Sequence, residues 1–435
     1  MRRTAPNPLT TTTGNSRSIR KRLIVAASIA AVGAMALAGC SSSGGSSAGG
    51  SSGGKTLTVW HYFSDPNQVK VMTDYAALFQ KENPGVKVSN VYVPYDQMDS
   101  KLISSAGAKS GPDVVVFNGG DADNLESAGT LADMSSDWSG FADKSQFPAS
   151  TVHKLSGKTY AVQGYVNLLG LWYNKDILTK IGVTAPPTTL AELNTDMGKA
   201  VKAGYQGITL CGLPQSQGEW QAFPWLTQAG FSYANPSASA LTAGLGVVQN
   251  WVKKGYLTKE ATTYDQTVPF QKFAAGKVAF SENGNWQIGT AKSTAKFNYG
   301  VAELPLGASG QKEYLGGEAE GIGKYSKNPS LAWKYLQATY YSSAGELIAL
   351  KDSGTIPARG DAAKNTAVSG NPLLKPFADA ITMYGATYPD NAVKPASVNT
   401  QQLQGGQAWS SVIAGASPAS AASTYISKLT PLLNK

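Results

Sequence analysis

The chain has 435 residues, of which 42% are hydrophobic and only 15% are charged, so it is long enough to bury the cores of two domains. Its formal net charge of +9 overstates the charge of the folded body, because residues 1–39 hold six of the 37 basic residues and no acidic one, which leaves 31 basic against 28 acidic residues. This balance and the lack of a basic cluster give no support to a nucleic-acid partner, and two histidines and two cysteines are poor material for a zinc site, a histidine-based triad or an intrachain disulfide.

Residues 1–39 predict a cleaved export signal. Basic residues gather between Arg17 and Arg22, and an apolar stretch of small and aliphatic residues runs from Leu23 to Ala38. Sixteen apolar positions are too few to span a bilayer comfortably, which favours a signal peptide over a transmembrane helix. Leu37-Ala38-Gly39-Cys40 resembles the lipobox of bacterial lipoproteins, so we expect Cys40 to be lipidated. The alternative is an ordinary signal peptide followed by an incidental cysteine.

Residues 40–55 predict a lipidated cysteine and a tether. Positions 41–54 contain only Ser, Gly and Ala, so they have no large apolar side chain to bury. A flexible chain of this composition spans roughly 20 Å. An anchor, a tether and a globular body together predict a protein held by its lipid at the outer face of the cytoplasmic membrane.

From Lys55 onward, short apolar runs alternate with amphipathic stretches, a pattern that predicts an α/β fold. Strands are expected at 57–60, 86–93 and 112–117, and helices at 66–82 and 95–106. Capping boxes are expected at Thr189–Glu192 and Ser343–Glu346, and further helices after Asn328-Pro329 and Ser417-Pro418. Because ligands bind at the carboxyl ends of parallel strands, the segments after Trp60 and Phe117 are candidates for a binding site.

Five segments in order resemble the extracellular solute-binding proteins of carbohydrate ABC transporters, the group that includes maltose-binding protein. They are Gly157–Val162 with Gly170–Asp176, Pro186–Leu193, Phe273–Phe280 with Gly284–Trp286, Tyr299–Ala302 with Leu304-Pro305, and Gly354–Arg359. Gln163 stands where the family usually has proline, and Leu190-Ala191 replaces a Trp-Asp pair. Both departures lie in scaffold segments and bear little on function.

The resemblance implies a two-lobe periplasmic-binding-protein fold of type II, with hinge strands and a ligand cleft between the lobes. One lobe would hold 56–162 and 321–355, and the other 163–320 and 356–435. The implied function is the non-catalytic substrate-binding component of an ABC importer, a monomer that captures a mono- or oligosaccharide and delivers it to the permease. No cofactor and no metal are expected.

The candidate site residues combine aromatic rings, which pack on the C–H face of a sugar, with carboxylates, amides and an arginine, which bind its hydroxyls. The resemblance places the ring of Trp286 in the cleft, and Tyr165 and Asn167 on the first crossover between lobes. The strand ends add His61 and Tyr62, then Asn118 and Asp121. The remaining candidates are Glu219, Trp220, Trp225, Glu318 and Arg359, and for Arg359 an ion pair at the hinge is an equal alternative.

Two other classes of function stay open at the level of the sequence. A secreted glycoside hydrolase would need two carboxylates at a fixed separation, and none of the acidic residues lies in a recognisable hydrolase motif. A binding protein for a non-sugar solute, such as a metal ion or an oxyanion, is the other. Ferric ion would favour clustered tyrosines, but Tyr340-Tyr341 falls on an expected helix and is better explained by packing.

Overall fold

The structure is a computed structural model that describes residues 55–306 and 312–434. The expected signal, Cys40 and the tether to residue 54 lie outside the described residues. Among the described residues, no helix combines the length and the apolar character that crossing a membrane requires.

A six-stranded sheet organises the first lobe, in the strand order β2-β1-β3-β12-β5-β4. Strands β1 (Lys55–His61), β2 (Val86–Tyr92) and β3 (Val114–Asn118) run parallel, and β12 (Glu318–Ile322) lies antiparallel to β3. The sheet is completed by β4 (Val152–Leu155) and β5 (Lys158–Val162). We call this sheet the first lobe together with its helices, which are α1 (Pro66–Glu82), α2 (Met98–Gly107), α3 (Ala122–Ser127), α4 (Ser135–Gly140), α11 (Pro329–Ala338) and α12 (Ser343–Ser353).

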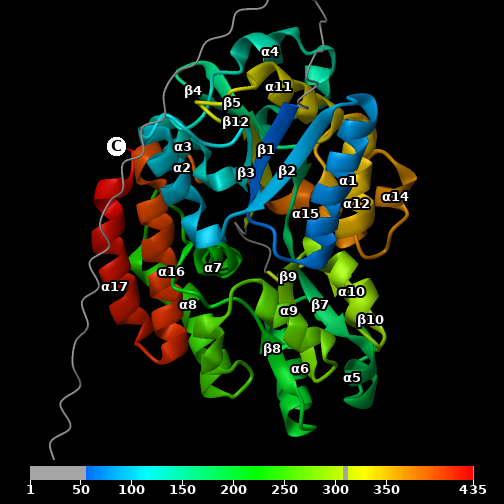
Figure 1. Ribbon diagram of the computed structural model, residues 1–435. Coiled ribbons are helices and arrows are strands. Elements are labelled where there is room, and N and C mark those ends of the chain that lie inside the picture. The colour runs from blue at the N-terminus through cyan, green and yellow to red at the C-terminus, as the bar shows by residue number, and fades with distance from the viewer. Residues whose placement is uncertain (1–54, 307–311, 435) are drawn as a thin grey trace, which may run out of the picture. The chain divides into compact units, whose positions relative to one another are not determined.

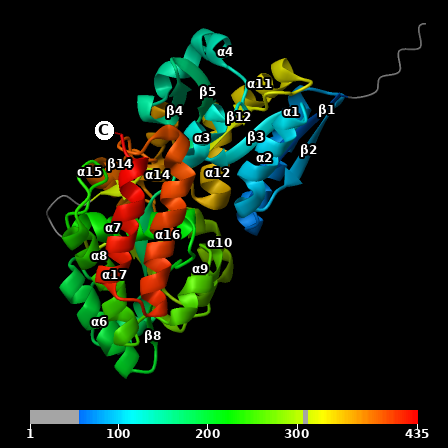
Figure 2. The same cartoon turned by 90° about the vertical axis from the view of Figure 1, so that its left-hand side faces the viewer.

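A four-stranded sheet, in the order β10-β7-β9-β8, organises the second lobe. Its strands are β7 (Leu169–Asn174), β8 (Gln206–Thr209), β9 (Val278–Gly284) and β10 (Tyr299–Ala302). We count with it α5 (Lys175–Lys180), α6 (Leu190–Lys202), α7 (Ser216–Gln228), α8 (Ala238–Lys253), α9 (Thr267–Ala274), α10 (Ile288–Thr294), α15 (Lys375–Tyr384), α16 (Val398–Ala414) and α17 (Pro418–Leu429). Helices α16 and α17 lie side by side and pack on α7 and α8 (Figures 1 and 2).

Short strands mark the places where the chain passes between the two sheets. β6 (Tyr165–Val166) pairs with β13 (Ile356–Pro357), and β11 (Glu313–Tyr314) pairs with β14 (Gly385–Ala386). Asn167 and Gly316 form an isolated bridge between two of these passages. The α/β two-lobe fold expected from the sequence is thereby confirmed in its sheets, whereas the stated lobe boundaries stay a prediction.

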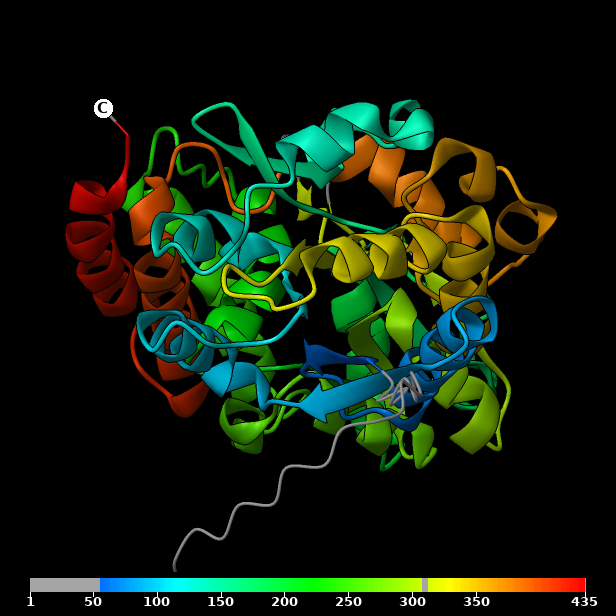
Figure 3. The same cartoon turned by 45° about the horizontal axis from the view of Figure 1, so that its top comes forward.

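The start of helix α1 is determined by its local sequence. The side chain of Asp65 accepts a hydrogen bond from the Asn67 N–H at 2.8 Å, and Pro66 occupies the first helical position, where no N–H is needed. The helix lies beside α12 and contacts it, and Figure 3 shows the two in blue and in gold. Two further short helices, α13 (Gly360–Ala363) and α14 (Thr366–Ser369), follow β13.

Two local expectations need correction. The capping box at Thr189–Glu192 forms with both of its hydrogen bonds, but the one expected at Ser343–Glu346 does not. Ser342 caps α12 instead, and the Glu346 carboxylate accepts the backbone N–H of Arg359. Tyr340 and Tyr341 lie in the turn after α11 rather than in the helix, although both rings are fully buried, as the packing interpretation required.

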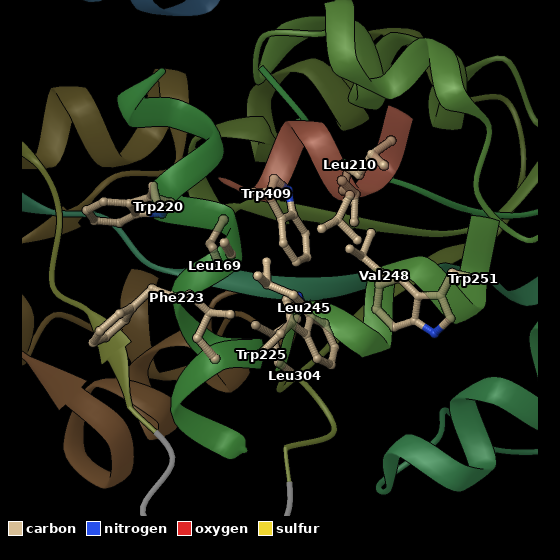
Figure 4. Close-up of a cluster of buried hydrophobic side chains, with 14 of the residues drawn as sticks. Leu169, Leu210, Trp220, Phe223, Trp225, Leu245, Val248, Trp251, Leu304 and Trp409 are labelled. Carbon is tan, nitrogen blue, oxygen red and sulfur yellow. The ribbon is translucent and has the colours of Figure 1, made fainter. Parts of the chain in front are cut away.

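The core of the second lobe is rich in tryptophan. Trp225 and Trp251 meet edge to face with ring centroids 5.0 Å apart, and Trp409 lies in the same cluster (Figure 4). All three side chains have no exposed surface. Large aromatic rings of this kind supply much of the buried area of a lobe and fix the helices that hold the site.

Candidate functional site

A cavity of about 330 Å³ lies between the two lobes. Its volume falls within the range of roughly 300–1,000 Å³ that is typical of small-molecule sites. The residues that line it come from both lobes and from the connections between them: Tyr62, Ser64, Asp65, Gln68, Tyr92, Pro94, Tyr95, Asp96, Asn118, Asn167, Leu213, Gln215, Ser216, Gln217, Trp220, Asp265, Gln266, Thr267, Trp286, Gln287, Gly317, Glu318 and Tyr388.

The first lobe meets the cavity at the carboxyl ends of its parallel strands. Tyr62 follows β1, Tyr95 follows β2, and Asn118 ends β3. The Asn118 amide donates to the Tyr95 hydroxyl at 2.9 Å, and that hydroxyl lies 3.2 Å from Ser216 Oγ on α7 of the second lobe. This chain of polar groups therefore connects the two lobes across the cavity.

Glu318 is the centre of a second polar chain. Its carboxylate accepts hydrogen bonds from the Tyr62 hydroxyl at 2.9 Å and from the Asn167 amide at 3.3 Å. Asn167 in turn accepts from the Asn285 amide at 2.9 Å, and Asn285 donates to the Gly354 carbonyl at 3.0 Å. Burial raises the pKa of Glu318, and hydrogen bonds from Tyr165 and Tyr62 oppose that shift only in part. This series of hydrogen bonds joins the first lobe, the crossover and the second lobe beside the main cavity.

Three aromatic rings at the cavity each rest against a glycine. A Cβ added to Gly316 would lie 2.0 Å from Trp220, one added to Gly120 would lie 2.1 Å from Tyr388, and one added to Gly284 would lie 1.8 Å from Trp286. Trp220 and Tyr388 also meet edge to face, with ring centroids 4.6 Å apart. Only glycine allows backbone to approach these rings so closely.

Two polar atoms of these rings have no hydrogen-bond partner among the described residues. They are Trp220 Nε1 and the Tyr388 hydroxyl oxygen, and both are buried. Because an unpaired buried polar group is costly, both atoms are suited to a ligand or an ordered water.

A second cavity of about 540 Å³ adjoins the first and shares Asp65, Thr267 and Gln287 with it. It lies between the start of α1 and the helices α9 and α10, and seven of its eleven lining residues carry a hydroxyl or an amide group.

Six of the twelve residues expected at the site line the main cavity: Tyr62, Asn118, Asn167, Trp220, Trp286 and Glu318. The six others, His61, Asp121, Tyr165, Glu219, Trp225 and Arg359, do not. Their places have simple physical reasons.

The alternation of β1 separates His61 from Tyr62. Leu57, Val59 and His61 point into the core, so the next residue, Tyr62, faces the cavity. Burial lowers the pKa of His61 to about 4, and its Nδ1 accepts the Phe63 N–H. Asp121 lies behind Asn118, where burial and the nearby Asp99 raise its pKa.

The 3.6-residue period of α7 places neighbouring residues of this helix on different faces. Gln217 and Trp220 share the cavity face, whereas Glu219 turns into the core, where its carboxylate accepts from the Tyr233 hydroxyl at 2.7 Å. Trp225 lies further along the helix in the core and donates to Glu282 at 2.9 Å.

The last two lie at the connections between the lobes. Tyr165 is buried with its ring 6.4 Å from that of Tyr340. The Arg359 guanidinium forms ion pairs with Asp143 at 3.1 Å and Asp361 at 2.7 Å. Of the two roles expected for Arg359, the structure therefore agrees with the ion pair and not with a place in the cavity lining.

Reasoning from sequence missed much of the second-lobe lining. Gln215–Gln217 follow β8, which runs parallel to β9, and Asp265–Thr267 open α9. The rule of strand ends applies to the loop after β8 as well, and would have found it. Tyr388 was not among the expected site residues, because its place at the cavity depends on long-range packing against Trp220.

Over residues 74–376, the chain matches the bacterial extracellular solute-binding proteins. It belongs to this family. The solute-binding protein also resembles the GacH receptor of Streptomyces glaucescens, solved unliganded and with acarbose, at a TM-score of 0.78 and 26% identity over 87% of this chain and 98% of that one. Maltose-bound MalE3 of T. maritima has the same fold, at a TM-score of 0.78 and 20% identity over 87% and 100% of the two chains.

Curated relatives match part of the solute-binding protein. Binding proteins of Brucella abortus and Brucella suis are 24% identical over 270 residues, which is 59% of this chain and 65% of theirs. The maltodextrin-binding protein MdxE of Bacillus subtilis is 28% identical over 313 residues, 68% of this chain and 72% of its own. A maltooligosaccharide ABC transporter solute-binding lipoprotein of Streptococcus pneumoniae is 27% identical over 65% and 67%.

Proposed function

We propose that this solute-binding protein captures a sugar in the cavity between its lobes and delivers it to the permease of an ABC importer. The observation that carries the proposal is the composition of the cavity. Trp220, Trp286 and Tyr388 offer aromatic faces, and Asn118, Asn167 and Glu318 offer amide and carboxylate groups. Pyranose rings need both kinds of partner, because they have apolar C–H faces and many hydroxyls.

The relatives support the same class of ligand. GacH was solved with acarbose, and MdxE and the pneumococcal lipoprotein carry maltodextrin and maltooligosaccharide in their names. Binding without chemical change, by a monomer, follows from the same proposal.

A thermal-shift screen of purified protein against sugars tests the proposal. A ligand that binds the folded protein alone stabilises it by RT ln(1 + [L]/Kd), about 2.7 kcal/mol at a hundredfold excess over Kd. At least one sugar should raise the Tm in a concentration-dependent way and be recovered unchanged. Failure of every mono- and oligosaccharide, or recovery of a cleaved product, would reject the proposal.

Anchoring through Cys40 completes the proposed function. The supporting features are the lipobox-like Leu37–Cys40 and the Ser/Gly tether. We expect Cys40→Ser to be released into the medium or to stay unprocessed, since it lacks the thiol that the lipid modifies. Fractionation of cells that express the two forms measures this. Equal membrane association of the variant and the parent would contradict lipidation at Cys40.

A further inference from the structure

The charge of the cavity lining is strongly one-sided. Four carboxylates line the main cavity, those of Asp65, Asp96, Asp265 and Glu318. Among the described lining residues there is no lysine, arginine or histidine, and the adjoining cavity likewise adds no basic residue. This concentration of acid is unusual for a body whose acidic and basic residues nearly balance.

None of the four carboxylates forms an ion pair within the described part of the chain. Asp65 accepts from Asn67 and Thr290, and Glu318 from Tyr62 and Asn167. These partners are neutral, so they satisfy oxygens without cancelling charge.

Asp96 and Asp265 have the most capacity left for a ligand. Asp96 is exposed and accepts no hydrogen bond from the described residues. Asp265 uses one oxygen, Oδ1, for the backbone N–H groups of Thr267 and Val268 at 2.8 and 3.1 Å. Its other oxygen has no partner among the described residues.

We infer that the cavity selects sugars by charge, binding an amine-bearing sugar more tightly than its neutral counterpart and excluding acidic sugars. This inference rests on the proposed function. An ammonium group in the cavity would form charge-assisted hydrogen bonds, which are about twice as strong as neutral ones. A carboxylated sugar would meet the carboxylates of Asp96 and Asp265 with no counter-ion among the lining residues, in a cleft where low-dielectric walls weaken solvent screening.

Matched pairs of sugars test the inference. The pairs are glucose with glucosamine, galactose with galactosamine, mannose with mannosamine, and cellotriose with the chitosan trimer, each measured by calorimetry at pH 6.5. In every pair that binds, the amine-bearing member should bind about tenfold tighter. The preference should shrink as NaCl rises, because salt screens charge. Glucuronate and galacturonate should not bind.

The double variant D96N/D265N assigns the effect to the cavity. Asparagine keeps the shape of each side chain and, at position 265, an oxygen for the Thr267 and Val268 N–H groups. The ratio of amine to neutral affinity should fall toward one in this variant. The control is Asp137→Asn on α4, an exposed carboxylate outside both cavities, which should keep the parental ratio.

The outcomes separate the inference from the proposed function. Equal or tighter binding of the neutral member, tight binding of a uronate, or a preference that the double variant keeps would overturn charge selection and leave sugar binding intact. If the double variant fails to fold, the salt dependence of the parent's preference decides. Binding of spermidine, a linear amine, with no response to any sugar would overturn both, because the ligand would then be a cation that is not a sugar. No response to any compound would likewise overturn both.

Discussion

At the scale of single residues, two tryptophans with similar chemistry have different tasks. Trp286 is half-buried at the cavity, while Trp225 is fully buried and donates to Glu282. Both were predicted as site residues from the sequence, because the residue type alone does not distinguish a tryptophan that binds a ligand from one that packs in a core. The difference comes from burial and hydrogen bonding, so it predicts opposite effects of truncation.

Trp286→Ala should lose sugar affinity and keep the fold. Truncating an aromatic anchor typically costs about 2 kcal/mol or more, or roughly thirtyfold in Kd. Calorimetry with the sugar that most raises the parent's Tm measures the loss, and the Tm without ligand should stay within a few degrees of the parent's.

Trp225→Ala is the contrasting variant. It removes a core ring and leaves the Glu282 carboxyl without its donor, so the free energy of unfolding should fall by about 3–5 kcal/mol.

The prediction for Trp286 has its own contradicting outcomes. If Trp286→Ala unfolds the protein, or binds sugar as the parent does, the Trp286 ring belongs to the core or does not contact the ligand.

A pH dependence of stability follows from Glu219. Burial raises the pKa of this carboxyl to about 7, against 4.5 for an ordinary glutamate, despite hydrogen bonds from Tyr233, Gln401 and Tyr314. Between pH 4.5 and 7 the unfolded chain loses this proton more readily than the folded one. The contribution of Glu219 is therefore fully present below pH 4.5 and is lost as the pH rises through 7.

Glu219→Gln removes this dependence. The free energy of unfolding of the variant, relative to the parent, should rise by about 3 kcal/mol at most between pH 4.5 and pH 8. Urea unfolding at several pH values measures the difference. Glu260→Gln, at an exposed carboxylate, should show no such gain. A constant difference between Glu219→Gln and the parent across this range would mean that the carboxyl titrates as it does in the unfolded chain.

At the scale of elements, the crossover backbone shapes the aromatic wall. Gly316 lies at the bridge to Asn167, and a Cβ there would overlap the Trp220 ring at 2.0 Å. Gly316→Ala should displace the indole and weaken sugar binding by up to roughly thirtyfold, with a stability cost of about 1–3 kcal/mol for overpacking. Calorimetry and thermal unfolding measure the two effects.

Gly246 provides the matched control for this substitution. It lies in the middle of α8, and a Cβ there would have no heavy atom within 4 Å. Gly246→Ala should keep the parental affinity and stabilise the helix by about 1 kcal/mol. Unchanged sugar affinity in Gly316→Ala would show that the position of Trp220 does not matter to the ligand.

Elements were easier to predict from sequence than the site. Asp65-Pro66 and Thr189–Glu192 start helices through contacts within four residues, so their patterns are local and were identified correctly. The Ser343–Glu346 expectation was wrong because Glu346 is taken by the Arg359 backbone, 13 residues away in sequence. The cavity depends on still longer separations, such as Tyr62 with Glu318, which no local pattern records.

At the scale of the whole molecule, hydrogen bonds join the two lobes around the cavity. Thr290 of α10 donates to Asp65 Oδ2 at 2.8 Å, Tyr95 lies 3.2 Å from Ser216, and Asn399 of α16 donates to Asp99 at 2.7 Å. Such contacts favour the arrangement in which the lobes meet. A ligand that binds this arrangement gains affinity in proportion to its population.

Thr290→Val tests this coupling, because valine keeps the shape of threonine and removes only the hydroxyl. A hydrogen bond to a charged group contributes about 1.5–3 kcal/mol, so the loss of this bond should weaken sugar binding by about tenfold or more. The loss should fall mainly on the dissociation rate, which surface plasmon resonance measures, since the bond holds the lobes together after the ligand has entered. Thr263→Val, which removes a hydroxyl bonded only within its own turn to the Glu260 carbonyl, should bind as the parent does. Equal dissociation rates in Thr290→Val and the parent would mean that the cavity walls hold the ligand without help from contacts between the lobes.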